Sequence, residues 1–177
     1  EMCIRDRNNT NAFGGWVKLT TTDSSGDDSH ATIDNGTTAL VLNTGSVVKG
    51  NLTVTTGHAS GITDNGAVTV GGNLVATTDD NNGVITLDQT TVTGTMDLTT
   101  HGTGNVTIDN AALDIVLIAS EIGGNLTLTS GAAAGITDNG TVTVAGNLVA
   151  TTDANNGVIN LDTTAVTGTM DLTTHGT

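Results

Sequence analysis

GNLTVTT at 50–56, GNLVATT at 72–78 and GTMDLTT at 94–100 decide the fold, because these three related segments recur at a constant offset of 22. Small or apolar residues alternate with other residues, as Leu74 and Ala76 do in the second segment, and a period of two is typical of β-strands. The β-branched Thr and Val favour strands, whereas the recurring Gly and Asn disfavour helices. We therefore predict an all-β chain with regularly repeated strands and almost no helix.

Each of these segments is followed by two further apolar stretches. The first begins at an offset of 11 from the leading glycine, and its copies are GITDNG at 61–66, GVITLD at 83–88 and NVTIDN at 105–110. The second closes the turn, and its copies are AVTV at 67–70, TTVT at 90–93 and LDIVLIASEI at 113–122. The longer third copy lengthens its turn, so the 74-residue unit consists of two 22-residue turns and one 30-residue turn.

The 74-residue unit is itself repeated. Residues 50–103 match residues 124–177 at a constant offset of 74, with 44 of 54 positions identical. Earlier in the chain, GWVKLTT from Gly15 resembles GTMDLTT from Gly94. The sequence therefore divides into repeat segments at 15–49, 50–123 and 124–177.

The two ends of the chain differ from the repeats. Residues 1–7 (EMCIRDR) resemble the translated end of a sequencing adapter, and we interpret them as a non-native scar with no partner in the repeat. Residues 8–14 form a leading edge, where Phe13 and Trp16 are suited to cover an open first turn. Because Thr177 matches Thr103, we expect the repeats to be truncated at the C-terminus and to continue with a segment close to GNVTIDN.

These repeats predict a right-handed, single-stranded parallel β-helix, or β-solenoid. Each turn of about 22 residues would lie on the previous one at ~4.8 Å, giving about six turns and a rod on the order of 30 Å long. The inward columns would be Leu52, Leu74 and Met96, and then Leu126, Leu148 and Met170. One outward hydroxyl ladder would hold Thr55, Thr77, Thr99, Thr129, Thr151 and Thr173. One corner column would hold Gly50, Gly72, Gly94, Gly124, Gly146 and Gly168.

An antiparallel sandwich is the alternative architecture. Asn-Gly pairs at Asn35, Asn65 and Asn139 are hairpin signals. They occur only once in each 74-residue unit, and a meander of hairpins gives no reason for equivalent faces to recur with a 22-residue spacing. The periodicity therefore favours the solenoid.

Charge and composition exclude several functions. The formal net charge is −14, and no Lys or Arg follows Lys49, so nucleic-acid binding is not expected. The longest apolar run, 115–119, is far shorter than the ~20 residues of a membrane-spanning helix. Without residues 1–7 the chain has no Cys, which excludes disulfides, Cys-ligated zinc and a Cys nucleophile.

We interpret the polar residues that could bind a metal ion or ice as turn and surface residues. His101 and His175 are equivalent turn positions, His58 is replaced by Ala132 in the second copy, and His30 lies in an acidic turn. A weak calcium site is the alternative reading of 79–82 (DDNN), although Asp80 becomes Ala154 in the second copy. Thr-x-Thr pairs also occur in ice-binding proteins, but Thr53 aligns with Val75 and Asp97, which breaks the array. We assign no catalytic, cofactor-binding or metal-ligating residue and no cofactor.

An enzyme is the functional alternative, because polysaccharide lyases and hydrolases use β-helices. Such a site needs paired carboxylates or a cationic base, together with aromatic platforms for sugar. The acids here are spaced one per turn, at Asp64, Asp88, Asp97 and Asp109. No Lys, Arg, Phe, Trp or Tyr lies beyond Lys49, so we predict no enzymatic activity.

Two longer stretches carry a family resemblance. GGNLTLTSGAAAGITDNGTVTVAGNLVATT at 123–152 and NGVINLDTTAVTGTMDLTT at 156–174 resemble the β-strand repeats of filamentous-haemagglutinin-like bacterial surface exoproteins. The resemblance covers about residues 15–177. It implies a segment of a large, secreted, right-handed β-helical stalk at the surface of a Gram-negative bacterium, used in adhesion or biofilm contact. We expect this acidic segment to be part of a longer monomeric rod. The resemblance also implies that a host or cell-surface ligand binds outside this segment.

Overall fold

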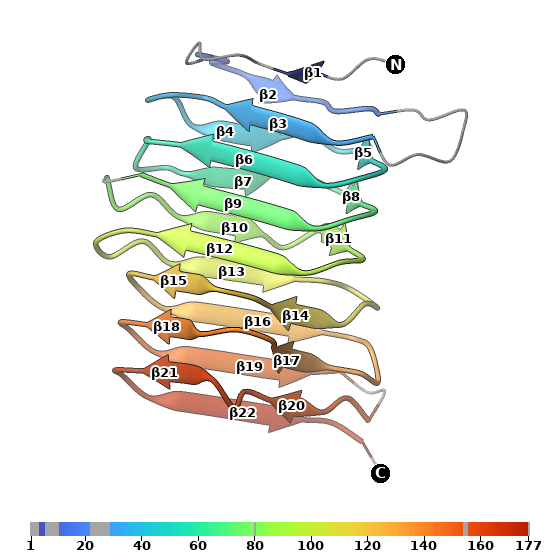
Figure 1. Cartoon of the computed structure of the whole chain (residues 1–177), viewed down its shortest axis with the longest axis vertical. Coiled ribbons are helices and arrows are strands. Elements are labelled where there is room, and N and C mark those ends of the chain that lie inside the picture. Colours follow the sequence, from blue (N-terminus) through green and yellow to red (C-terminus); the bar gives the residue numbers. More distant parts are fainter. Residues whose placement is uncertain (1–3, 6–10, 22–28, 80, 154–155, 177) are drawn as a thin grey trace.

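The chain folds as a stack of parallel β-strands (Figure 1). The computed structural model describes residues 4–5, 11–21, 29–79, 81–153 and 156–176. These residues form 22 strands and no helix, and every strand pairing is parallel. The all-β prediction is therefore confirmed.

The strands are arranged in three sheets along the rod. The 11-stranded sheet contains β1 (Ile4–Arg5), β3 (Ala31–Asp34), β6 (Leu52–Thr56), β9 (Leu74–Thr78), β12 (Met96–Thr100), β14 (Ile115–Leu117), β15 (Ser120–Ile122), β17 (Ile136–Asp138), β18 (Val142–Val144), β20 (Ile159–Asn160) and β21 (Thr164–Val166). The eight-stranded sheet contains β2 (Trp16–Val17), β4 (Leu40–Leu42), β7 (Ile62–Asp64), β10 (Ile85–Leu87), β13 (Val106–Asp109), β16 (Leu126–Ser130), β19 (Leu148–Thr152) and β22 (Met170–Thr174). The three-stranded sheet contains β5 (Ser46–Val48), β8 (Val68–Val70) and β11 (Thr90–Val92).

The chain coils as a right-handed β-solenoid. In Figure 1 the strands in front run leftward and those behind run rightward while the chain descends from its N-terminus. Residues that pair on neighbouring turns, such as Val106 with Leu126 and Ile62 with Ile85, have sequence numbers that differ by 20 and 23, respectively. The rod has about seven turns of roughly 22 residues, one more than predicted.

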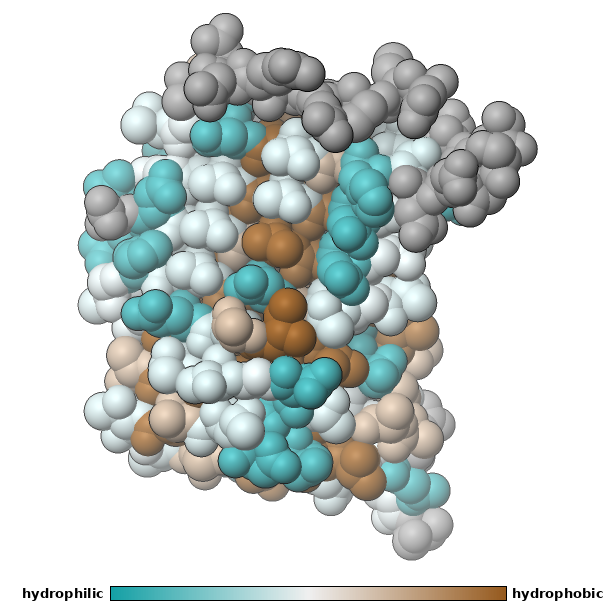
Figure 2. All heavy atoms as spheres, viewed as in Figure 1, coloured by the Kyte–Doolittle hydropathy of each residue, from teal (hydrophilic) through white to brown (hydrophobic). Residues whose placement is uncertain are grey.

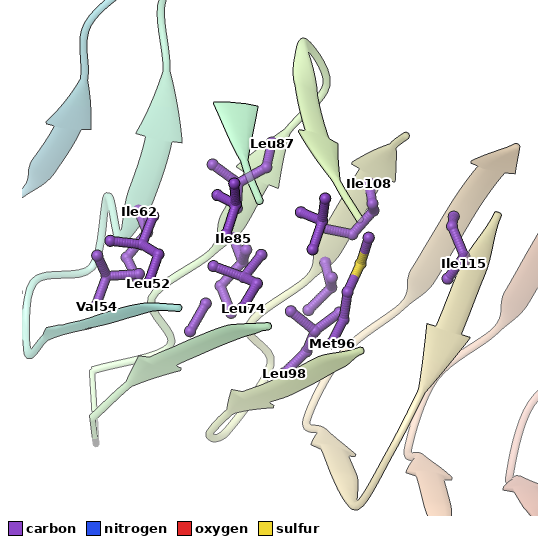
Figure 3. Close-up of a cluster of buried hydrophobic side chains, with 14 of the residues drawn as sticks. Leu52, Val54, Ile62, Leu74, Ile85, Leu87, Met96, Leu98, Ile108 and Ile115 are labelled. Atoms are coloured by element: carbon purple, nitrogen blue, oxygen red, sulfur yellow. The ribbon is translucent and has the colours of Figure 1, made fainter. Parts of the chain in front are cut away.

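The core is a narrow column of aliphatic side chains between the sheets. Leu52, Leu74 and Met96 are register neighbours with no more than 1% of their surface exposed, as predicted. Figure 3 shows how side chains of facing strands meet at each level, for example Leu74 of β9 with Ile85 of β10. Because two facing aliphatic layers fill this space, the core needs no aromatic residue.

The second copy of the unit lies on the opposite side of the rod from the first, contrary to our prediction. β6, β9, β12 and β14 follow one another in the 11-stranded sheet and carry the chain through three turns. The counterpart of β6 is β16, which is reached half a turn later in the eight-stranded sheet. One unit therefore makes three and a half turns. The last part of the unit, residues 94–123, makes one and a half of these turns.

The half turn also divides the predicted columns in two. Thr55, Thr77 and Thr99 are neighbours in the 11-stranded sheet, whereas Thr129, Thr151 and Thr173 are neighbours in the eight-stranded sheet. The six corner glycines are divided in the same way, so the prediction of single columns was wrong. The physical reason is that residues 94–123 form four strands, while the two preceding 22-residue segments form three each.

A buried asparagine marks each change of side. Asn110 follows β13, is fully buried, and binds the edge of β11 through both ends of its carboxamide. Its Oδ1 accepts a hydrogen bond from the Val92 N–H at 2.7 Å, and its Nδ2 donates to the Val92 carbonyl at 3.0 Å. Asn35, which follows β3, binds the N–H and carbonyl of Phe13 in the same way. The Asn110 side chain thus replaces a neighbouring strand where the three-stranded sheet ends at β11.

The Asn-Gly pairs do not form hairpins. Asn35 binds the backbone of Phe13, and Asn65 lies between β7 and β8, where its Oδ1 accepts a hydrogen bond from the Thr44 N–H at 3.0 Å. These asparagines satisfy backbone groups of neighbouring turns. The antiparallel alternative is therefore excluded for the described residues.

The N-terminal segment contributes to the first turn. Ile4 and Arg5 pair in parallel with Ala31 and Thr32, so the expectation that residues 1–7 have no partner was wrong for these two residues. Trp16 belongs to β2 but is 61% exposed, whereas Leu19 is buried. Among the side chains that the structure describes, Leu19 is the first buried aliphatic residue, and the partly buried Val17 packs against the core.

Candidate functional site

Two equivalent histidines bind the backbone of the preceding turn. The Nδ1 atom of His101 lies 2.7 Å from the Thr78 carbonyl, and Nδ1 of His175 lies 2.8 Å from the Thr152 carbonyl. A carbonyl only accepts hydrogen bonds, so Nδ1 carries the proton in both rings. This position matches the prediction that both are turn residues.

The other two histidines also contact backbone groups. The Asn51 N–H donates to Nδ1 of His30 at 2.8 Å, and the Ser60 N–H donates to Nδ1 of His58 at 3.0 Å. Within the described residues, no group of three or more His, Cys, Asp or Glu side chains could hold a metal ion.

The turn at 79–82 uses its amide side chains for contacts between turns. Nδ2 of Asn81 donates to the Gly57 carbonyl at 2.6 Å, and Oδ1 of Asn82 accepts from the Thr103 N–H at 2.9 Å. Asp80 lies outside the described residues. The amide oxygen of Asn82, a natural calcium ligand, already has a backbone partner.

We expect millimolar calcium to shift the melting temperature of the chain by less than about 2 °C. Ligand stabilisation follows RT ln(1 + [L]/Kd), so a weak turn site adds little free energy of unfolding at this concentration. Thermal unfolding followed by circular dichroism, with magnesium as the control ion, checks this expectation. A shift of several degrees with calcium alone would assign calcium binding to the turns at Asp79 and Asp153.

One carboxylate is held between two turns. Oδ2 of Asp64 accepts hydrogen bonds from the Gln89 N–H at 3.0 Å and from the Thr90 hydroxyl at 2.8 Å, while its Oδ1 is buried without a partner. Burial raises the pKa of Asp64, and the nearby charge of Asp88 raises it further. The spacing of one acid per turn predicts isolated carboxylates. That prediction is wrong for Asp64 and Asp88, because the stacking of turns brings these two side chains together.

The equivalent carboxylate of the second copy has the opposite pKa shift. Burial alone would raise the pKa of Asp138, but hydrogen bonds from Thr164, Thr163 and Asp162 outweigh it and lower the pKa. Both Asp138 oxygens accept backbone N–H groups, whereas only one Asp64 oxygen does. The same sequence position thus has a raised pKa in the first copy and a lowered pKa in the second.

These opposite shifts predict opposite effects of two matched substitutions. Folding favours protonated Asp64, so this group stabilises the fold below its ordinary pKa, and that contribution is lost as the pH rises through the raised pKa. The Asp138 contribution is present above its ordinary pKa and is lost as the pH falls through the lowered one. At pH 7 we expect Asp64→Asn to raise the melting temperature by about 1 °C and Asp138→Asn to lower it similarly. Equal shifts of the same sign at pH 7, or an unchanged pattern at pH 3, would contradict this assignment.

Asp97 and Asp109 lie on outward strand positions. Burial raises the pKa of Asp97, whose register neighbour on β9 is Val75. Oδ1 of Asp109 accepts the Ala111 N–H at 2.8 Å and holds the turn after β13. The register of Thr53, Val75 and Asp97 confirms that the Thr-x-Thr array is interrupted.

Two columns of Gly-Asn pairs join successive turns, and only their glycines were predicted to form a column. Oδ1 of Asn51 accepts the Asn73 N–H at 2.9 Å, and Oδ1 of Asn73 accepts the Thr95 N–H at 3.0 Å. A Cβ on Gly72 would meet the Gly50 backbone carbon at 2.8 Å and lie even closer to Asn51 Oδ1. The glycine therefore leaves room for the asparagine of the preceding turn. The asparagines could have been found from the sequence, because Gly-Asn recurs at these positions.

The face shown in Figure 2 is mostly hydrophilic or neutral, with hydrophobic residues in its middle and near the C-terminal end. Among the described parts of the chain, no helix has the length and apolar character needed to cross a membrane.

Residues 28–99 and 103–173 match the model of a family described as repeats of unknown function (DUF5649). No curated protein and no solved structure matches the chain.

Proposed function

The chain belongs to the family of repeats of unknown function (DUF5649). From its repeated β-solenoid and its resemblance to filamentous-haemagglutinin-like repeats, we propose that it is a structural segment of a large bacterial exoprotein. The proposed exoprotein is secreted or surface-anchored and acts as a stalk in adhesion or biofilm contact. The segment itself has no catalytic role, and its host or cell-surface ligand binds elsewhere on the longer rod.

The observation that carries this proposal is the continuity of the stack. Parallel pairing extends through the eight levels of one sheet, and buried aliphatic residues run from Leu19 to Ala150. His30, His101 and His175 and the Asn side chains discussed above bind the backbone of a neighbouring turn. Such a fold grows by adding repeats, because each repeat contacts only its neighbours.

Each matched family repeat adds a fixed length to the rod. The two matched stretches start at positions 28 and 103 and extend from β3 into β12 and from β13 into β22, respectively. Each repeat therefore adds three and a half turns, or about 17 Å at ~4.8 Å per turn. The length of the rod is then set by the number of repeats, and this property suits a stalk that holds another domain away from a surface.

Antibody labelling of intact cells tests the proposed location. Antibodies raised against the 177-residue chain are expected to label unpermeabilised bacteria that carry the gene, and external protease should remove the signal. An antibody against a cytosolic protein of the same cells is the control. Labelling that appears only after permeabilisation would contradict the stalk proposal.

The enzyme alternative predicts a different result. A β-helical polysaccharide lyase or hydrolase releases new reducing ends from its substrate, whereas a stalk segment releases none. We expect no release from a panel of acidic and neutral polysaccharides. Release that is abolished in the Asp64→Asn, Asp88→Asn double variant would favour the enzyme.

A further inference from the structure

The tripeptide Asp-Asn-Gly occurs three times in the chain, and each copy lies in a different environment. The copies occupy 34–36, 64–66 and 138–140, and the asparagine is buried in the first copy and exposed in the other two. An asparagine side-chain amide that precedes glycine is open to attack by the backbone nitrogen of that glycine, because glycine has no Cβ to hinder the approach. The three copies therefore share one possible reaction and differ in what surrounds it.

The first copy holds both reacting groups in hydrogen bonds. The Gly36 N–H donates to Oδ1 of Asp34 at 2.9 Å. Oδ1 of Asn35 accepts the Phe13 N–H, and its Nδ2 donates to three backbone carbonyls. These bonds would have to break before the Gly36 nitrogen could reach Cγ of Asn35.

The third copy leaves both reacting groups without a protein partner. The Asp138 carboxylate accepts its hydrogen bonds from the next turn and not from the Gly140 N–H. Within the residues that the structure describes, neither the Asn139 carboxamide nor the Gly140 N–H makes a hydrogen bond. The reaction at Asn139 therefore breaks no hydrogen bond of the side-chain amide.

The second copy is intermediate between these two. Oδ1 of Asn65 accepts the Thr44 N–H at 3.0 Å, so its side-chain amide is held to the preceding turn. The Gly66 N–H makes no hydrogen bond with any described part of the chain. One hydrogen bond thus separates the environment of Asn65 from that of Asn139.

The exposure of Asn139 does not arise from an end of the chain. β17 lies between β14 and β20, and β18 lies between β15 and β21 (Figure 1). The Asn139 N–H donates to the Leu117 carbonyl at 2.7 Å, and the Gly140 carbonyl accepts the Thr163 hydroxyl at 2.7 Å. Turns on both sides therefore hold the backbone here, while the side chain of Asn139 stays exposed.

We propose that Asn139 is a site of spontaneous deamidation, at which the turn between β17 and β18 converts to a mixture of aspartate and isoaspartate. The Gly140 nitrogen loses its proton to hydroxide and forms a bond to Cγ of Asn139. The Cγ–Nδ2 bond then breaks, and the nitrogen takes a proton from water and leaves as ammonia. Water opens the resulting cyclic succinimide at either of its two carbonyls. The net change is the uptake of one water and the release of one ammonia.

The product changes both the charge and the length of the turn. Either product places a new carboxylate beside Asp138, in a chain whose formal net charge is already −14. Isoaspartate also adds an atom to the backbone between β17 and β18, which pair with neighbouring turns in fixed register. The modification therefore records the age of a chain at a defined turn of the rod.

Peptide mapping of aged protein tests the proposal. The folded 177-residue chain is incubated in mildly alkaline buffer, digested with pepsin at acidic pH to stop the reaction, and analysed by mass spectrometry. We expect Asn139 to convert fastest and Asn65 more slowly. Conversion of Asn35 should be at least about tenfold slower than that of Asn139, because it requires local unfolding. An isoaspartate-specific methyltransferase should label the peptide that contains the Asn139 product.

Two controls separate the effect of the fold from that of the local sequence. In urea the three copies are expected to convert at rates within about twofold of one another, because an unfolded chain leaves only the shared tripeptide. The Asn139→Gln variant keeps a side-chain amide but needs a larger ring for the same attack. This variant is expected to lose the fastest conversion and to keep the circular dichroism spectrum of the unsubstituted chain.

Three results would overturn the proposal: equal rates at Asn139 and Asn35 in the folded chain, no conversion of Asn139 while the unfolded chain reacts, or an unchanged fastest conversion in Asn139→Gln. These results concern the chemistry of one turn and do not depend on where the chain lies in the cell. A negative result here therefore leaves the proposed cell-surface location to its own test.

Discussion

Replacement of Leu126 by aspartate is expected to lower the melting temperature by about 10 °C or to unfold the stack. Leu126 is 1% exposed in β16 and lies in register between Val106 and Leu148. An unpaired buried carboxylate costs several kcal/mol, a large part of the total stability of a domain. Thermal unfolding by circular dichroism measures the loss.

Asn125→Asp is the matched control. Asn125 is exposed next to Leu126, and its Oδ1 accepts the Asn147 N–H at 2.8 Å. Aspartate keeps an acceptor oxygen at this position, so the change in free energy of unfolding should stay within ~0.5 kcal/mol. Equal losses in the two variants would show that the inward and outward faces of β16 are assigned wrongly.

The second large effect is expected for Asn110→Ala. This substitution removes the carboxamide that satisfies both backbone groups of Val92 and donates to the Asp114 carbonyl. Leaving buried polar groups unsatisfied costs roughly 1–3 kcal/mol each, so we expect a loss of about 3–5 kcal/mol. Hydrogen exchange should also become faster at the Val92 amide, which distinguishes loss of this cap from a general loss of stability.

Asn105→Ala provides the comparison for Asn110→Ala. Asn105 is exposed, and its Oδ1 accepts one hydrogen bond, from the Asn125 N–H. Water can replace that contact, so the expected loss is about 1 kcal/mol or less. If both variants lose the same stability and the Val92 amide stays protected, Asn110 is not the cap that the geometry indicates.

Much of the fold could be predicted from local periodicity. The 22-residue spacing and the alternation around Leu74 gave the strand type, the inward face and the parallel stacking, all of which depend on regular local sequence. The half turn could not be predicted in this way, because the stretch 94–123 can be divided into strands in more than one manner. Only the pairing of Met96 with Leu117 shows that a full turn is completed before β15.

The polar contacts were predicted less well than the core. Periodicity placed His101 in a turn but could not show that its ring binds the Thr78 carbonyl. It also left Asp64 and Asp88 as separate acids, because their proximity depends on the register between turns. Asn110 was missed because an asparagine before a turn is ordinarily a surface residue, and its burial here follows from the end of β11.

The half turn between copies gives the rod a symmetry of its own. Consecutive units are related by an approximate two-fold screw axis, so only every second unit faces the same direction. The true translational period is then twice the 74-residue offset, and roughly 34 Å of rod. A rod of many units has equivalent opposite faces, and it can lie between two surfaces while presenting the same threonine columns to each.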